Sequence, residues 1–179
     1  LSTDQGLPGN ATLLLENLNL QKFIEGRGPA FLRSMSTSLQ GRVDIEGRFE
    51  EPDSLVFRGE IDGAGIAIRN YELRNSAKIR FTAAKKRLAV EKTSIVGEGT
   101  GMTLSGTIPL DGSPNLDLIL SGSLNLELLN QIESRLQVSG TAGLDIRVSG
   151  AVEDPQLIGQ MTLRDSRLDF SDSPLFFSS

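Results

Sequence analysis

The sequence of 179 residues has no histidine, no cysteine and no tryptophan. Without histidine it has no imidazole general base, no Ser-His-Asp triad and no histidine-bound metal. Without cysteine it has no thiol nucleophile, zinc ribbon, iron–sulfur site or disulfide framework. A glycine-flanked serine nucleophile is absent as well. We therefore expect a protein that is not an enzyme and that holds no catalytic residue, metal or cofactor.

Long hydrophobic runs and positive charge are also scarce. The longest aliphatic runs, such as 13–15 and 118–120, have three residues, whereas a membrane-spanning helix needs about 20. No signal-peptide pattern is present. The net charge of −5 and the pI of about 4.8 argue against nucleic acid as a partner. Because the chain starts at Leu1 without methionine and stops in mid-pattern, we expect it to be part of a longer chain.

Hydrophobic residues alternate with polar residues through nearly the whole chain. Between Leu136 and Val152 every even position is apolar or glycine, and the odd positions are mostly polar. This period of two predicts strands with one apolar and one wet face, which is typical of antiparallel sheets. We expect strands at 102–110, 116–124 and 136–152, shorter ones at 43–49, 57–61 and 157–163, and further ones near 66–73, 77–83, 87–95 and 166–170. Hairpin turns are predicted at 83–87, 97–101 and 111–115.

Helical spacing is confined to two short pieces of the chain. One covers 128–132, with Asn125 as its N-cap. The other covers 20–24, breaks at 26–29 and resumes to Met35. These pieces are too short to cover the predicted sheet.

Six glycines fall inside these strands in register with the apolar residues: Gly47, Gly59, Gly106, Gly122, Gly150 and Gly159. A glycine within a strand marks a bend, a bulge or a close approach of another backbone. Repeated on the apolar side, such glycines allow a sheet to curl tightly around that side. We therefore predict an all-β fold, an elongated and curled antiparallel sheet that forms a half-pipe groove with one or two short helices. The alternative is an ordinary β-sandwich with scattered bulges.

The chain also resembles itself. Residues 47–55 (GRFEEPDSL) correspond to 150–157 (GAVEDPQL), with the same spacing between the two glycines as between the two prolines. Upstream, 18–20 and 124–126 both read Leu-Asn-Leu. Repetition on this scale indicates an array whose neighbouring units share an edge, and chance similarity between strand-rich segments is the alternative. We expect one elongated β-groove segment made of about two repeats, residues 1–100 and 101–179.

The apolar side of the predicted sheet carries many large side chains, and burying each contributes about 1.5–3 kcal/mol. This side must therefore be covered, either by a second sheet or by an apolar ligand. Few aromatic residues and many aliphatic ones favour a smooth lining that fits acyl chains, because a closed sandwich needs larger side chains opposite its glycines. The predicted groove-lining residues are Val43, Ile45, Phe57, Ile61, Leu104, Ile108, Leu118, Leu120, Leu144, Ile146, Val148, Met161 and Leu163.

The segment 143–168, GLDIRVSGAVEDPQLIGQMTLRDSRL, resembles the TamB family, which is related to AsmA-like proteins. The preceding segment 124–130, LNLELLN, fits the family as well, and the resemblance is clearest over 101–170. The first repeat departs from the family pattern, because Gly59 is placed differently and the connection over 20–35 is longer.

This resemblance implies a curled sheet with a hydrophobic interior, called a β-taco, in a protein that is anchored in the inner membrane and bridges the Gram-negative periplasm. Family members are proposed to pass phospholipids to the outer membrane. We therefore expect a periplasmic segment of a lipid conduit that carries phospholipid acyl chains, or detergent, in its groove. Its expected partners are the remainder of the same chain and an outer-membrane TamA-type barrel protein. The acyl chains would diffuse along the groove with their headgroups in water.

Two other functions stay open. The first is a chaperone-like groove that assists outer-membrane β-barrel proteins or autotransporters together with a TamA partner, through pairing at an open sheet edge. The second is a purely structural β-sandwich array, which predicts a closed, dry core and no lipid that co-purifies with the protein.

Overall fold

The computed structural model describes residues 9–19, 35–132, 136–170 and 176–178. The helix predicted at 20–24 lies outside this part of the chain. The described residues are mainly strands, accompanied by one short α-helix and one 3-10 turn. The elements are β1 (Gly9–Leu18), β2 (Met35–Gly47), η2 (Pro52–Ser54), β3 (Val56–Ile68), β4 (Tyr71–Asn75), β5 (Ile79–Ala84), β6 (Arg87–Gly97), β7 (Thr100–Pro109), β8 (Leu116–Asn125), α2 (Glu127–Ile132), β9 (Leu136–Gly150), β10 (Pro155–Phe170) and β11 (Phe176–Ser178).

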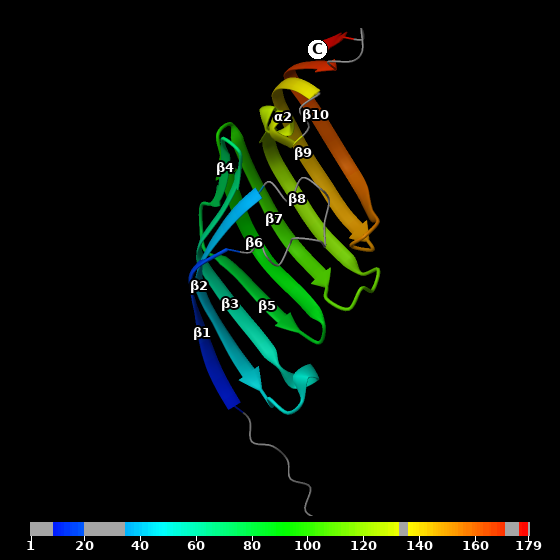
Figure 1. Cartoon of the computed structure of the whole chain (residues 1–179). Helices are drawn as coiled ribbons and strands as arrows, with labels where there is room; N and C mark the ends of the chain where they lie inside the picture. The colour runs from blue at the N-terminus through cyan, green and yellow to red at the C-terminus, as the bar shows by residue number, and fades with distance from the viewer. Residues whose placement is uncertain (1–8, 20–34, 133–135, 171–175, 179) are drawn as a thin grey trace, which may run out of the picture.

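All described strands belong to one antiparallel sheet, in the order β1-β2-β3-β4-β6-β7-β8-β9-β10-β11 (Figure 1). Between β3 and β6, two short strands share one place: β4 pairs with the end of β3, and β5 pairs with its first half. Asn75 fills the break between these two strands. Its Oδ1 accepts the Ala64 N–H at 2.7 Å, and its Nδ2 donates to the carbonyls of Asp62 and Ala77. The hydrogen bonding therefore continues across the break.

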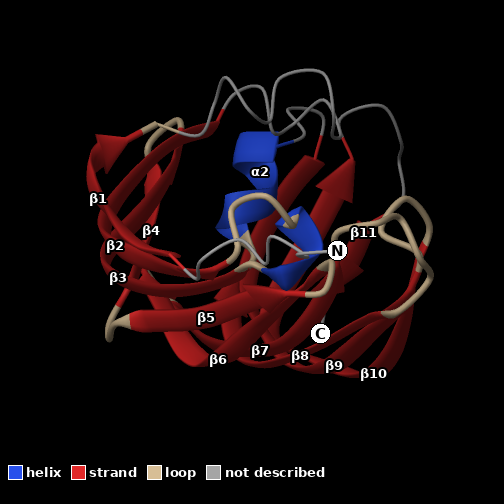
Figure 2. Cartoon of the chain, turned by 90° about the horizontal axis from the view of Figure 1, so that it is seen from below, coloured by secondary structure: helices blue, strands red, loops and turns tan. Residues whose placement is uncertain are grey.

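The sheet curls strongly around its apolar side. Seen from below, its strands follow an arc from β1 to β10, and α2 lies inside the arc (Figure 2). Gly106 on β7 and Gly122 on β8 have φ angles of +138° and +136°, and a Cβ at either position would overlap the backbone of the adjacent strand. Both positions therefore require glycine, which permits the close approach that a tight curl needs. The predicted all-β fold with a curled antiparallel sheet is confirmed, and the described strands do not form a two-sheet sandwich.

Shifts of register keep the apolar side chains on one side of the sheet, although along one strand these residues change from even to odd positions in the sequence. On β6, the pairing with β7 shifts between Val90 and Thr93. As a result Leu88 and Val90, before the shift, point to the same side as Thr93 and Ile95 after it. A strict period of two would have turned the second pair outward.

The strand boundaries differ from the predicted ones at a few places. The strand expected at 66–73 is divided by a turn, in which Arg69 has a positive φ of +53°. Met35, expected to end a helical piece, begins β2, and the last two predicted strands form the single strand β10, which has a register shift around Asp165. Turns lie at the predicted positions in 83–87, 97–101 and 111–115.

The buried core lies at one end of the sheet, around α2. Two clusters make it up, one toward β3 and β4 and the other toward β9. The first contains Ile68, Tyr71, Leu73 and Leu128, and the second contains Leu126, Val138 and Ala142. Of the buried hydrophobic residues in the described part of the chain, Ile61 and Leu116 alone lie outside these clusters. Among the described residues, the rest of the apolar side therefore adds little to the packed core.

Candidate functional site on the concave face

The inner side of the curled sheet, here called the concave face, carries the apolar side chains. Directly opposed residues of neighbouring strands point to the same side of a sheet, so the register traces rows across this face. One row runs from β1 to β10 and contains only apolar residues and glycine: Leu13, Val43, Gly59, Phe81, Val90, Gly106, Leu118, Val148 and Leu157. The concave face is thus continuously apolar from one edge of the described sheet to the other.

Every residue predicted to line a groove lies on the concave face. Ile61 is buried, at 5% exposed, whereas Met161 and Leu163 on β10 are 60% and 50% exposed. The others, from Val43 on β2 to Val148 on β9, are half-buried. The structure therefore brings the whole predicted lining together on one surface, and its contact with lipid stays a prediction.

The sequence analysis missed several residues of this surface. Leu13, Phe81 and Val90 stand in the same row as the predicted residue Val43. The ring of Phe81 covers Gly59, where a Cβ would overlap it, as aromatic side chains do when they pack over a strand glycine. Alternation alone does not show which residues of distant strands stand opposite each other, so the signal that would have found Phe81 lies in the strand register.

The outer side of the sheet, here called the convex face, carries the charges. Arg147 holds Asp117 through two hydrogen bonds of 2.8 and 2.9 Å. Lys78 and Arg80 both pair with Glu60. The hydrogen bonds from Lys78 and Arg80 lower the pKa of Glu60, and the bond to Glu60 raises the pKa of Lys78. Exposed ion pairs of this kind contribute little to stability one by one, so their main effect is to keep this face in water.

Polar groups fix the start of α2 against the sheet. Asn125 Oδ1 accepts the Glu127 N–H at 3.0 Å, so its side chain caps the first N–H group of α2 as expected, but Asn125 is the last residue of β8 and Leu126 stands directly before the helix. The backbone N–H of Asn125 donates to Thr100 Oγ1 at 3.0 Å, and its Nδ2 donates to the carbonyl of Glu98. The Tyr71 hydroxyl donates a hydrogen bond to the Glu98 carbonyl and also lies within hydrogen-bond distance of Thr100 Oγ1. The turn between β6 and β7 therefore holds the start of α2 from one wall of the arc.

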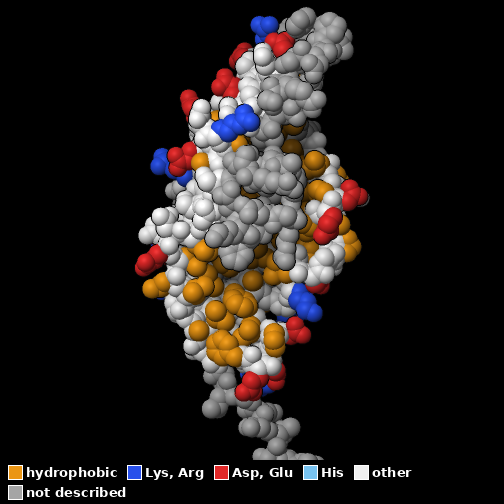
Figure 3. Space-filling view, in the orientation of Figure 1, with side chains coloured by type: hydrophobic (Ala, Val, Ile, Leu, Met, Phe, Trp, Pro, Cys, Tyr) orange, Lys and Arg blue, Asp and Glu red, His pale blue; other side chains and the backbone are white. Residues whose placement is uncertain are grey.

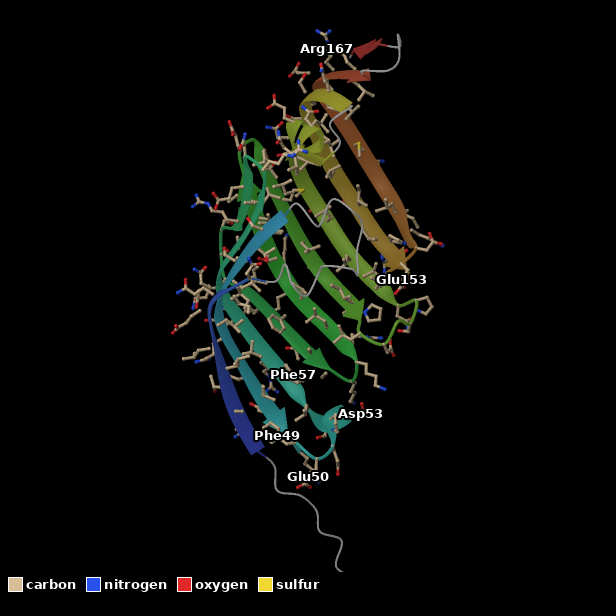
Figure 4. All side chains as sticks on the ribbon, in the orientation of Figure 1. Phe49, Glu50, Asp53, Phe57, Glu153 and Arg167 are labelled. Carbon is tan, nitrogen blue, oxygen red and sulfur yellow. The ribbon has the colours of Figure 1, made fainter. Side chains whose placement is uncertain are left out.

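No described residue covers the lower part of the concave face, away from α2. In Figure 3, hydrophobic side chains gather over the lower parts of β2, β3 and β5, and charged side chains lie at the margin. Phe57 on β3 and Phe49 in the turn after β2 belong to this lower end (Figure 4). Glu50 and Asp53 lie near them in the connection from β2 to β3, and Glu153 lies in the turn between β9 and β10. An apolar surface with a charged rim suits a molecule that has an apolar tail and a polar head.

Within the described residues, no group of three or more His, Cys, Asp and Glu side chains is placed to hold a metal ion. No helix among them has the length and apolar character needed to cross a membrane. Comparison with known proteins finds no matching family model, no matching curated protein and no matching solved structure. The interpretation of the site therefore depends on its own geometry and on the sequence pattern.

Proposed function

We propose that this chain is a segment of a TamB-like protein whose concave face carries phospholipid acyl chains between the inner and the outer membrane, in support of outer-membrane biogenesis. The observation that carries the proposal is the row from Leu13 to Leu157, which crosses the concave face without a polar residue. The likeness of 143–168 to the TamB family supports the compartment and the route.

The concave face has the properties of a surface that needs an apolar occupant. Most of its lining is half-buried, because the packed clusters are confined to the α2 end. About ten methylenes that move from water to such a surface contribute ~8 kcal/mol before the cost of association. Aliphatic side chains and glycines dominate the lining, so an acyl chain meets few polar groups on it.

The proposed mechanism uses no covalent step. The acyl chain lies on the concave face and diffuses along it, while the headgroup stays in water on the open side. The ion pairs of the convex face, such as Arg147 with Asp117, keep the outer side hydrated. Charge is therefore separated from the path of the acyl chain by the sheet itself.

The resemblance supplies the remaining parts of the proposal. The segment lies in the periplasm, within a protein that is anchored in the inner membrane by a part outside this sequence. The remainder of the same chain continues the groove, and an outer-membrane TamA-type barrel protein is the partner at its far end. Nucleic acid is not a partner, in keeping with the net charge of −5.

Mass spectrometry of the gently purified protein tests this function, with two isoleucines on neighbouring strands as a matched pair. Ile146 lies on the concave face of β9, whereas Ile119 lies on the convex face of β8, opposite Arg147. Ile146→Asp places an unpaired carboxylate in the lining, which costs several kcal/mol, so bound phospholipid or detergent should fall at least about tenfold. Ile119→Asp faces water and Arg147 and should bind as the wild type does. An empty wild-type protein, or equal loss in both variants, would refute the proposal.

A second candidate function, chaperone-like assistance to outer-membrane β-barrel proteins, is favoured by the edge of β10. Among the described strands, residues 155–164 pair with β9 alone, and every one of them is exposed. An unpaired edge of this length offers its backbone groups to an incoming strand. A photo-crosslinker at Met161 should trap barrel precursors if this candidate is right, and lipid if the first is right.

A further inference from the structure

We propose that the exposed half of β10, residues 155–164, binds one extended strand of another protein, which runs antiparallel to β10, carries no charge and places a large apolar side chain opposite Gly159. The inference rests on the second candidate function and is independent of lipid carriage. It adds which strand the edge accepts: its direction, its register and the residue that selects it.

The two similar segments of the sequence form the same unit of three strands. β1, β2 and β3 are neighbours in the sheet, as are β8, β9 and β10. In each unit one place on the middle strand faces a glycine of the third strand: Val43 faces Gly59, and Ile146 faces Gly159. Val43 and Ile146 also stand at the same distance from the glycine that ends their strand. β10 is therefore the counterpart of β3.

The outer edge of β3 shows what such an edge accepts. β4 pairs with its far end, at 65–68, and β5 pairs antiparallel with its first half, at 56–61. On β10, the strand β11 pairs with the far end, at 167–169, whereas no described strand other than β9 pairs with 155–164. Among the described residues, β10 therefore has a counterpart of β4 and none of β5. A strand bound to its first half would continue the ladder that β11 begins.

The unpaired half of β10 is exposed and uncharged. Leu157 and Met161 on the concave side are 68% and 60% exposed, and Ile158 on the convex side is 65% exposed. No charged residue stands between 155 and 163, although charged side chains commonly protect free sheet edges. In Figure 1, β10 forms the margin of the sheet on its side. The edge therefore offers free backbone groups and apolar side chains, and a charged strand finds no ionic partner on it.

The glycines of the concave face indicate which side chain the incoming strand needs. At three glycines inside strands, large apolar residues of both neighbouring strands stand opposite the glycine. These sets are Gly59 with Val43 and Phe81, Gly106 with Val90 and Leu118, and Gly122 with Met102 and Leu144. Gly159 has Ile146 on one side and no described residue on the other. A large apolar residue of an incoming strand would complete this set, as Phe81 does where its ring lies over Gly59.

The strand β5 is the template for a synthetic probe. Its apolar side faces the concave-side residues of β3, with Phe81 opposite the glycine, and on the convex side its Arg80 pairs with Glu60. On β10 the residue after Gly159 is the neutral Gln160, so the probe carries threonine in place of arginine. The probe is the capped, fluorescein-labelled peptide VTITFTAQ, whose phenylalanine stands opposite Gly159 when the peptide is bound.

Fluorescence anisotropy measures the binding of this peptide to the protein. Alanine in place of the peptide's phenylalanine should weaken binding by about fivefold. Aspartate at the same position should abolish binding, because its carboxylate would lie beside Ile146 without a partner. In the protein, Met161→Lys puts a charge on the edge and should weaken binding of the phenylalanine peptide. Leu14→Lys, at an exposed convex position of β1 on the other edge of the sheet, should bind it as the wild type does.

A diazirine on the phenylalanine of the probe maps the site, and it should label Ile146, Leu157 and Met161. Equal binding of the phenylalanine and alanine peptides, with labels on β10, would overturn the selection at Gly159 and leave pairing at this edge standing. Pairing with another protein, and the second candidate function with it, would be refuted by no binding of either peptide, by labels elsewhere, or by equal binding to Met161→Lys and Leu14→Lys. A dimer of this chain joined through β10 would refute it as well. Lipid carriage is decided separately, by the mass spectrometry of Ile146→Asp and Ile119→Asp.

Discussion

Asn130 on α2 and Val138 on β9 form a closed pair of hydrogen bonds. Asn130 Nδ2 donates to the Val138 carbonyl at 2.8 Å, and the Val138 N–H donates to Asn130 Oδ1 at 2.7 Å. The pairing of β8 with β9 has already ended at Thr141, so the carboxamide takes the place that a neighbouring strand would occupy. Because Val138 is buried, at 6% exposed, both of its polar backbone groups need such partners.

Removing this carboxamide should loosen α2 from the sheet. Asn130→Ala leaves the buried N–H and carbonyl of Val138 without their partner, so the free energy of unfolding in urea should fall by about 1–3 kcal/mol. Gln137→Ala, at an exposed position next to Val138 in the sequence, should change it by less than about 0.5 kcal/mol. Equal unfolding midpoints for the two variants would mean that Asn130 does not anchor the helix.

The curl should depend on Gly106 more than on a glycine nearby in the same strand. Gly106→Ala forces a Cβ into the carbonyl of Asp117 at a φ of +138°, and such strain costs about 1–3 kcal/mol. Gly101→Ala meets nothing within 4 Å and should be close to neutral. Urea unfolding of both variants measures the difference. Equal stability of Gly106→Ala and Gly101→Ala would show that the curl tolerates a side chain at Gly106.

Much of this fold could be predicted because two local patterns agree. Alternation placed residues such as Leu104 and Ile146 on one side of their strands, and glycines such as Gly106 stood in the same register. Together they predicted a sheet that curls around its apolar side, which the structure confirms.

The remaining features depend on contacts between distant parts of the chain. After the bulge between Val90 and Thr93, the odd positions of β6 instead of the even ones point to the concave face. Only the pairing of β6 with β7 reveals this change. In the same way, Leu128 was expected on a short helix, but its packing against Ile68 joins β3 and α2, which are separated in the chain by β4 to β8. No local pattern encodes that pairing, so the place of α2 inside the arc could not be predicted.

Acid should weaken the charge network at Glu60 on the convex face. Hydrogen bonds from Lys78 and Arg80 hold the pKa of Glu60 below its ordinary value of 4.5 in the folded protein. The ionised form therefore stabilises the folded state above pH 4.5, and this contribution is lost as the pH falls through the lowered pKa. In melting curves, Glu60→Gln should lose part of the acid dependence below pH 4.5. High salt should shrink the difference, because it screens exposed pairs. If the melting temperatures of the wild type and the variant fell in parallel as the pH is lowered, the stabilising role of ionised Glu60 would be contradicted.

Charge on the concave face should stop lipid transfer without breaking the sheet. Leu104 and Ser105 are neighbours on β7, but Leu104 faces Leu120 on the concave side, whereas Ser105 faces Ile119 on the convex side. Leu104→Asp puts a carboxylate in the path of the acyl chain, where it has no partner, so transfer in cells should be lost. Ser105→Asp faces water and should transfer lipid normally. Leu104→Met keeps the volume and the apolar character of the side chain and should also remain active. Circular dichroism separates a blocked face from an unfolded protein, because a folded but inactive Leu104→Asp variant is the expected result. A folded Leu104→Asp variant that transfers lipid at the normal rate would mean that acyl chains do not travel over this face.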